Sequence, residues 1–274
     1  MRSTFRRLAS RLASTALTTG TVGCLAAWLP ATAAPARAAT PAEAAKANAD
    51  LAGPAFSKVH QWLHEKMLPA IDPETKLLRD TPFAWNYQDS ASDCFPFMAW
   101  AAYFTDRPVF DGPVLEMLQA EIRLGSHWDN VIPVDFPLGV GQKATHLAGD
   151  YVMFAASEYM KDGLVAIVEA VGPGPFLDRM KAICDAMWKR AIIYSRYGKL
   201  VTENSEANGD LLQVLTRMYG YTGDRQYLEY ARRLADNFLA DPEFTPPALD
   251  DHSCEFIGGL GLLQGVLSTT DPEA

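Results

Sequence analysis

Residues 93–110, DCFPFMAWAAYFTDRPVF, and residues 210–227, DLLQVLTRMYGYTGDRQY, follow one pattern, and this pattern decides the fold. Each segment runs from an aspartate through an apolar stretch to an aromatic residue. Thr, Asp, Arg and a second aromatic residue follow, and the second aromatic lies 17 positions after the aspartate. Residues 254–274, CEFIGGLGLLQGVLSTTDPEA, begin a third copy. Such repeats predict stacked helical hairpins, which bury their apolar faces against their neighbours.

The apolar residues elsewhere recur with helical spacing, and turn residues separate the periodic stretches. Alternation of the kind that predicts a strand is weak and occurs only in NVIPVDF, residues 130–136. The sequence therefore predicts an all-α fold of about eight helices. We expect them at 55–69, 91–104, 113–124, 145–170 (with a break near 161–163), 175–195, 206–219, 225–239 and 252–268.

The predicted helices are of two kinds. The third, fifth and seventh are amphipathic; in 225–239 the apolar stripe comprises Tyr227, Leu228, Ala231, Leu234 and Phe238. The second, sixth and eighth are apolar around more of their circumference, which is typical of helices enclosed on several sides. This alternation predicts hairpins arranged in two layers, with amphipathic outer helices and enclosed inner helices.

The last predicted helix is an inner one, and its glycines Gly258, Gly259 and Gly261 would permit close packing against a neighbour. The third copy of the repeat stops where its outer helix should begin. We therefore expect the domain to be incomplete at its C-terminus. The alternative is a short open solenoid whose last helix is covered by a second copy in a homo-oligomer.

The first 38 residues differ from the rest: four arginines in MRSTFRRLASRLA precede an uncharged, mildly apolar stretch and small residues. This order predicts a secretory signal and a secreted or periplasmic protein. A twin-arginine signal at Arg6-Arg7 and a lipoprotein site at Cys24 are alternatives. The stretch is too polar for a membrane anchor. We expect residues 39–54 to be a linker and residues 55–274 to form the domain.

Without residues 1–38 the chain keeps 19 basic and 33 acidic side chains, a net charge of −14. This acidic balance argues against nucleic acids and anionic membranes as partners and is compatible with neutral glycans. Three cysteines would remain, which do not make a disulfide framework.

Acidic residues gather where the inner helices are predicted to begin. Because parallel inner helices would bring these ends to one face, we expect one site there. The candidate catalytic residues are Glu206, Asp210, Asp251 and Glu255. The candidate substrate contacts are Trp85, Tyr87, Asp89, Asp93, His146, Asp150, Glu203 and His252. The alternative is that these acids cap helix N-termini, where acids are favourable without any ligand.

Paired carboxylates are the groups that cleave glycosidic bonds, one as acid and one as base or nucleophile. Glu206 and Asp210 are four residues apart, so they share one helix face. His252 and Glu255 provide too few ligands for a metal. His60 and His64 are also four apart, on the first helix, and we interpret them as surface histidines. No metal or cofactor is expected.

The phrases PFAWNYQDSASDCFPFMAW, TENSEANGDLLQVLTRMYGYTGDRQYLEYARRLADNFL and DDHSCEFIGGLGLL resemble the six-hairpin glycosidase-like superfamily of (α/α) toroids. The resemblance extends over residues 55–268 and includes no diagnostic motif. It implies a partial (α/α)6 toroid whose site lies where the inner helices begin, with catalysis by Asp or Glu. The count of about eight helices is fewer than six complete hairpins contain.

These observations favour a secreted carbohydrate-active protein with glycoside hydrolase-type acid/base chemistry, either an active enzyme or an inactive fragment. One alternative is a non-catalytic helical-repeat scaffold that binds a partner protein. The other is a polysaccharide lyase or epimerase. We rank the last one lower because it needs cations near the acids, and Arg and Lys are sparse there.

Overall fold

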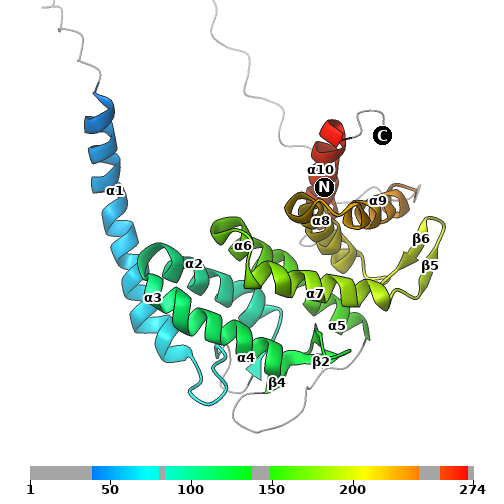
Figure 1. The fold of residues 1–274 in the computed structure, drawn as a ribbon, viewed down its shortest axis with the longest axis horizontal. Helices are drawn as coiled ribbons and strands as arrows, with labels where there is room; N and C mark the ends of the chain where they lie inside the picture. The colour runs from blue at the N-terminus through cyan, green and yellow to red at the C-terminus, as the bar shows by residue number, and fades with distance from the viewer. Residues whose placement is uncertain (1–38, 80–83, 138–148, 241–253, 271–274) are drawn as a thin grey trace, which may run out of the picture. The chain divides into compact units, whose positions relative to one another are not determined.

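A computed structural model describes residues 39–79, 84–137, 149–240 and 254–270 of the chain (Figure 1). The chain divides into two compact units, Met1–Lys46 and Ala47–Ala274. In the described part of the first unit, Thr40 and Glu43 form a reciprocal capping box. Glu43 N donates to Thr40 Oγ1 at 3.2 Å, and Thr40 N donates to Glu43 Oε2 at 2.7 Å. The site lies in the second unit, which is described below.

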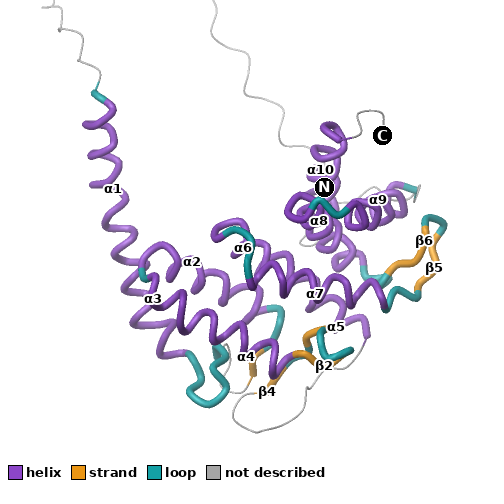
Figure 2. Tube along the Cα trace, viewed as in Figure 1, coloured by secondary structure: helices purple, strands orange, loops and turns teal. Residues whose placement is uncertain are grey.

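Most described residues are helical, which confirms the all-α expectation, and the strands are short (Figure 2). Several helices contain a widened π-helical turn. The helical segments are α1 (Pro41–Trp62), η1 (Leu63–Met67), η2 (Leu68–Ala70), η3 (Asp89–Cys94), α2 (Phe95–Thr105), α3 (Arg107–Val109), η4 (Phe110–Val114), α4 (Leu115–Gly125), α5 (Gly149–Glu158), η5 (Tyr159–Leu164), α6 (Val165–Val171), α7 (Pro175–Lys189), α8 (Ser205–Thr222), α9 (Arg225–Leu239) and α10 (Cys254–Thr270).

The expected inner helices lie side by side and run parallel. Trp100 Nε1 on α2 donates to the Ala166 carbonyl on α6 at 2.8 Å. The helix formed by α5, η5 and α6 contacts α8 at two levels. Ser157 bonds to Asp210, and further along both helices Glu169 bonds to Arg217. The contacts between α8 and α10 progress along both helices in the same way. The beginnings of these helices therefore lie toward one end of the row.

Two glycines set the spacing between α8 and α10. A Cβ on Gly209 would lie 2.7 Å from Glu255 Cβ, and one on Gly259 would lie 2.7 Å from Leu212 Cγ. Only glycine permits this approach. The expectation of close packing is confirmed at Gly259, whereas Gly261 has no atom within 4 Å of a Cβ position.

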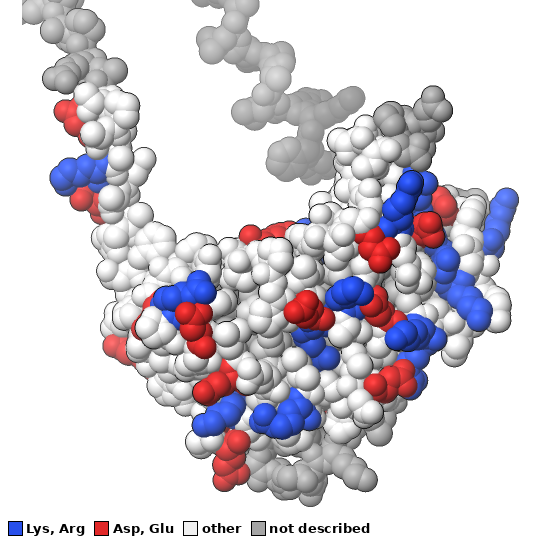
Figure 3. Space-filling model, viewed as in Figure 1, with Lys and Arg blue, Asp and Glu red and all other residues white. Residues whose placement is uncertain are grey.

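The amphipathic helices bury the stripe that their spacing predicts. On α9 all five predicted apolar positions are buried, and Asp224 caps the helix by accepting from Gln226 N at 2.9 Å. Charged side chains remain outside. On the face drawn in Figure 3, basic and acidic residues are interspersed, so the described part of that face has no large patch of one sign.

Two expectations about local structure need correction, and a third is confirmed. Residues 41–54, expected to be a linker, are helical and belong to α1. The helix expected to reach residue 195 ends at Lys189, and a hairpin of β5 (Ile193–Ser195) and β6 (Gly198–Leu200) follows. The weak strand signal in residues 130–136 is confirmed. The other strands are β1 (Ala84–Trp85), β2 (Ser126–Trp128), β3 (Ile132–Pro133) and β4 (Phe136–Pro137), which pair as β1–β4 and β2–β3.

Among the described residues, no helix has both the length and the apolar character that crossing a membrane requires. The segment interpreted as an export signal, residues 1–38, lies outside the described residues.

Candidate functional site

A buried carboxyl group, that of Asp210, lies at the centre of the expected site. Asp210 belongs to the second turn of α8 and is fully buried. Ser157 Oγ on α5 donates to Asp210 Oδ2 at 3.2 Å, and the other oxygen, Oδ1, has no hydrogen-bond partner within 3.5 Å. Lys161 Nζ approaches Oδ1 to 3.6 Å. An ionised carboxylate is costly in such a place unless it is fully paired.

Lys161 is the cation of the cluster and projects from the π-helical turn η5. Its Nζ lies 2.8 Å from Glu255 Oε2, 3.1 Å from Asp162 Oδ2 and 3.6 Å from Asp210 Oδ1. Gln213 Nε2 donates to the same Glu255 oxygen at 2.7 Å. Three carboxyl groups thus face one ammonium group, and one positive charge cannot neutralise all three.

Burial decides which carboxyl group keeps its proton. It raises the pKa of Asp210 to about 8, because the attraction of Lys161 does not offset burial and the repulsion from Glu158 and Glu255. Burial alone would lower the pKa of Lys161, but its hydrogen bond to Glu255 and the charge of Asp210 raise that pKa above its usual value. At neutral pH we therefore expect a protonated Asp210 beside a charged Lys161.

Glu158 extends the cluster toward the surface. This half-buried residue is the last of α5, one turn from Lys161. Burial raises the pKa of Glu158 to about 7, and repulsion from Asp162, Glu206 and Asp93 adds to the shift. Glu158 therefore lies close enough to feel the charges of two residues: Asp93, which is exposed before α2, and Glu206 at the start of α8.

The structure thus brings together four of the residues expected from the sequence, Asp93, Glu206, Asp210 and Glu255, from three parallel helices. The capping alternative does not account for those on α8, because Asn204 is the cap: its Oδ1 accepts from Ala207 N at 2.9 Å. Lys161 attracts Asp210 and Glu255, whereas the acids around Glu158 repel one another and raise its pKa.

Three other expected residues lie at the edge of this cluster or outside it. Asp150 is exposed at the start of α5, where it accepts from Thr202 Oγ1 at 3.4 Å. Asp89 accepts from Asn86 Nδ2 at 3.0 Å, a contact within its own turn. Glu203 is exposed in the segment before α8. His146, Asp251 and His252 lie outside the described residues.

Trp85 and Tyr87 need correction as candidate substrate contacts, because both are fully buried. Tyr87 OH donates to Glu121 Oε1 at 3.0 Å, and Arg179 Nε donates to Glu121 Oε2 at 2.9 Å. Trp85 packs edge-on against Tyr87. Neither ring presents a face to a ligand, and both belong to the hydrophobic core.

Sequence reasoning missed Glu158, Lys161 and Asp162. The available signal was the interruption near residues 161–163, which we interpreted as a break in a helix. The chain instead continues as the π-helical turn η5, and such turns occur frequently at functional sites. Gly163 fits there because a Cβ would lie 2.7 Å from the Ala91 carbonyl oxygen.

A stripe of exposed aromatic residues lies on α2, and none of its members was among the expected substrate contacts. Phe97, Trp100 and Phe104 follow Asp93 at spacings of four, three and four, so they share its helix face. Phe97 is 63% exposed and Trp100 is 40% exposed. Since α2 and its preceding turn η3 contact η5 and α6, this stripe continues from the acid cluster along the same row of helices.

Among the described residues, an open pocket lies away from the acid cluster, between α7 and α9. It is lined by Lys181, Asp185, Trp188, Lys189, Asp224, Gln226 and Tyr230. It contains none of the residues expected to be functional and none of the acid cluster, so we do not take it as the site.

Comparison with known proteins finds no family model and no curated sequence that matches this chain.

Proposed function

We propose that this chain is a carbohydrate-active protein of partial (α/α) toroid type that uses glycoside hydrolase-type acid/base chemistry at the acid cluster. The proposal rests on the different protonation states of neighbouring carboxyl groups in the cluster. With pKa values of about 7 and 8, Glu158 and Asp210 keep protons near neutral pH, beside other carboxyl groups of the same cluster. Glycosidic cleavage needs one protonated and one ionised carboxyl group at close quarters.

Burial suggests how the roles are divided. Glu158 is half-buried and would act as the general acid that protonates the departing glycosidic oxygen. Glu206 is also half-buried, raises the pKa of Glu158, and would act as the base or nucleophile. Asp210 and Glu255 are held against Lys161 inside the protein, so we now regard these two as positioning residues.

The aromatic stripe on α2 supports a glycan ligand. Exposed rings beside carboxylates give a surface on which the apolar faces of sugar rings can pack, while the acids reach the linkage. Phe97 and Trp100 therefore take the part that we first expected of Trp85 and Tyr87.

The test is release of reducing ends from a panel of neutral oligosaccharides by the full chain. Glu158→Gln and Glu206→Gln should each abolish turnover without lowering the melting temperature. Glu116→Gln is the matched control, because Glu116 is an exposed acid on the outer helix α4. Turnover that persists in both site variants would exclude this assignment, and turnover that falls equally in the control would point to a general effect on folding.

Lys161 bears on the ranking of a lyase or epimerase, since it places a cation among the acids. Three carboxyl groups already surround it, so it offers no free charge to a uronate. Hydrolysis therefore remains the first proposal. An unsaturated uronate product, detected by its ultraviolet absorption, would reverse this ranking. A stable complex with a partner protein and no turnover of any glycan would favour the scaffold.

We also propose that residues 1–38 direct export. Mass spectrometry of the protein recovered from outside the cytoplasm should show a mature chain that begins near residue 39. An intact N-terminus on an exported chain would contradict this proposal.

A further inference from the structure

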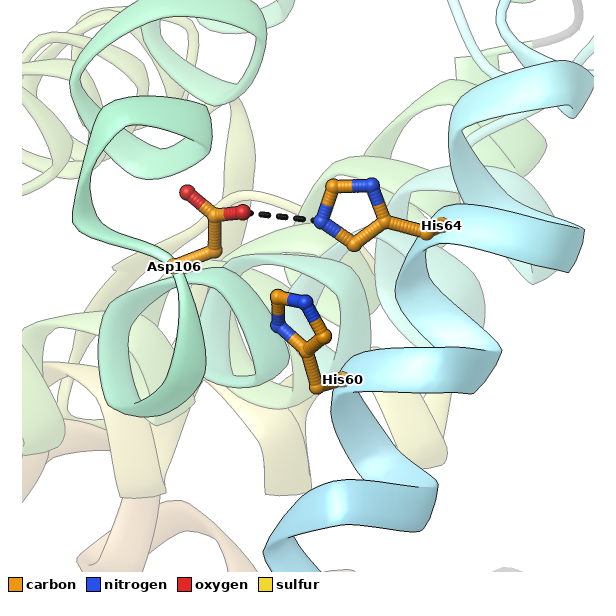
Figure 4. A group of neighbouring side chains, drawn as sticks. All are labelled: His60, His64 and Asp106. Atoms are coloured by element: carbon orange, nitrogen blue, oxygen red, sulfur yellow. Dashed lines mark hydrogen bonds and ion pairs between the residues drawn. The ribbon is translucent and has the colours of Figure 1, made fainter.

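A second group of polar side chains lies where η1 meets the turn between α2 and α3. His60 is in the last turn of α1, His64 is in η1, and Asp106 directly precedes α3 (Figure 4). One nitrogen from each histidine and one carboxylate oxygen all lie within 4.8 Å of one another. His64 Nε2 lies 2.8 Å from Asp106 Oδ2, and the two imidazole rings have centroids 4.4 Å apart.

The fold aims all three side chains at one point. Histidines four positions apart lie on one face of a helix, one turn above the other. A hydrogen bond to the other carboxylate oxygen fixes the orientation of Asp106. Its Oδ1 accepts from Val109 N at 3.3 Å and so caps α3. This hydrogen bond leaves Oδ2 directed toward the histidines. An outer hydrogen bond of this kind is what orients ligands in metal sites.

We propose that His60, His64 and Asp106 bind one divalent late first-row transition ion, of which Zn²⁺ is the representative. Two imidazoles and one carboxylate are donors that such ions prefer, and three protein ligands leave a position for water. Bonds of about 2.1 Å at tetrahedral angles separate neighbouring ligand atoms by about 3.4 Å. The three atoms therefore need only small side-chain rotations, and the solvent-exposed His64 is free to make one.

Binding changes one hydrogen bond and breaks no other contact of Asp106. The ion takes the lone pair of His64 Nε2, and the ring proton that faced Asp106 moves to Nδ1. The carboxylate then bonds to the ion in place of the imidazole N–H. The cap on Val109 N is kept, because it uses the other oxygen.

The site is separate from the acid cluster. Asp93 lies just before α2 and Asp106 just after it, so the helix separates them by about 20 Å at 1.5 Å per residue. The ion therefore takes no part in the proposed acid/base chemistry. It would join the end of α1 to the α2–α3 turn. That role suits α1, which has no buried residue of its own.

Isothermal titration of the full chain with Zn²⁺, after treatment with a chelator, tests the proposal. We expect one equivalent to bind and the melting temperature to rise with it. His60→Ala, His64→Ala and Asp106→Ala should each weaken binding at least about tenfold. His127→Ala is the matched control, because His127 is an exposed histidine on β2, outside the cluster.

Cobalt provides a second readout that does not depend on folding stability. Co²⁺ bound by these ligands should show the visible absorption of a four- or five-coordinate site, and Zn²⁺ should displace it. The proposal is overturned if the wild-type chain binds no Zn²⁺ at millimolar concentration. It is also overturned if the double variant of His60 and His64 binds as tightly as the wild type, which would assign the ion to other residues.

Discussion

The ammonium nitrogen of Lys161 lies 2.8 Å from Glu255 Oε2, and this contact joins the π-helical turn η5 to the first turn of α10. The two residues are far apart in the sequence and meet because both helices pack on α8. Asp210, on α8 between them, faces the same ammonium group. Lys161 is thus the electrostatic centre around which three parallel helices are arranged.

Lys161→Met should lower the free energy of unfolding by about 3 kcal/mol at pH 7, because it leaves buried carboxyl groups without their cation. The loss should be smaller at pH 5, where more of these carboxyl groups hold protons. Urea denaturation at the two pH values measures both effects.

Lys181→Met is the control for this change. Lys181 pairs with Asp185 one turn away on α7, and its side chain is 47% exposed, against 17% for Lys161. Exposed pairs of this kind contribute less than about 1 kcal/mol. Equal losses in the two variants would show that the position of Lys161 has no special importance.

The stability of the protein should fall as pH rises from about 4 to about 8. Glu158 and Asp210 have pKa values of about 7 and about 8 in the folded state, against about 4 in the unfolded chain. The folded state therefore binds more protons in this range, and the stabilisation present below pH 4 is lost as pH passes the folded pKa values. Each proton contributes a slope of at most about 1.4 kcal/mol per pH unit.

Asp210→Asn isolates the contribution of one group. The amide oxygen still accepts from Ser157, and the side chain no longer titrates. The variant should lose less stability than the wild type between pH 5 and pH 8, as measured by urea denaturation at intermediate pH values. Parallel curves for the two proteins would mean that Asp210 is ionised throughout.

The sequence predicted those features that depend on local periodicity. The apolar stripe and the bounds of α9 followed from spacing and turn residues, because one buried face leaves a clear signal. Part of the acid cluster followed too, because Glu206, Asp210 and Glu255 mark helix starts. Lys161 could not be identified in this way. Its importance depends on α8 and α10 packing against η5, and no local pattern contains that information.

Burial explains the error at Trp85 and Tyr87. An aromatic residue near acids reads the same in the sequence whether it faces a ligand or the core. Only the packing of Glu121 and Arg179 around the Tyr87 hydroxyl shows which it is.

Tyr87→Phe tests this correction. Removing the hydroxyl leaves Glu121 with one donor fewer, so the free energy of unfolding should fall by about 1 kcal/mol. The kcat/KM for any glycan that the wild type cleaves should stay unchanged, because the ring is fully buried. A raised KM with unchanged stability would restore Tyr87 as a substrate contact.

The glycines of α10 allow a matched test of its packing on α8. Gly259→Ala should destabilise the protein by about 1–3 kcal/mol, because the new Cβ would lie 2.7 Å from Leu212 Cγ and force the helices apart. Gly261→Ala, two residues further along the same helix and in exposed space, should instead stabilise it by up to about 1 kcal/mol, since alanine favours helix and meets no atom within 4 Å. Thermal and urea denaturation of both variants measure whether the free energy of unfolding falls or rises in each. Stabilisation by both substitutions would mean that α10 does not pack on α8 in solution, and the contact between Lys161 and Glu255 would be lost with it.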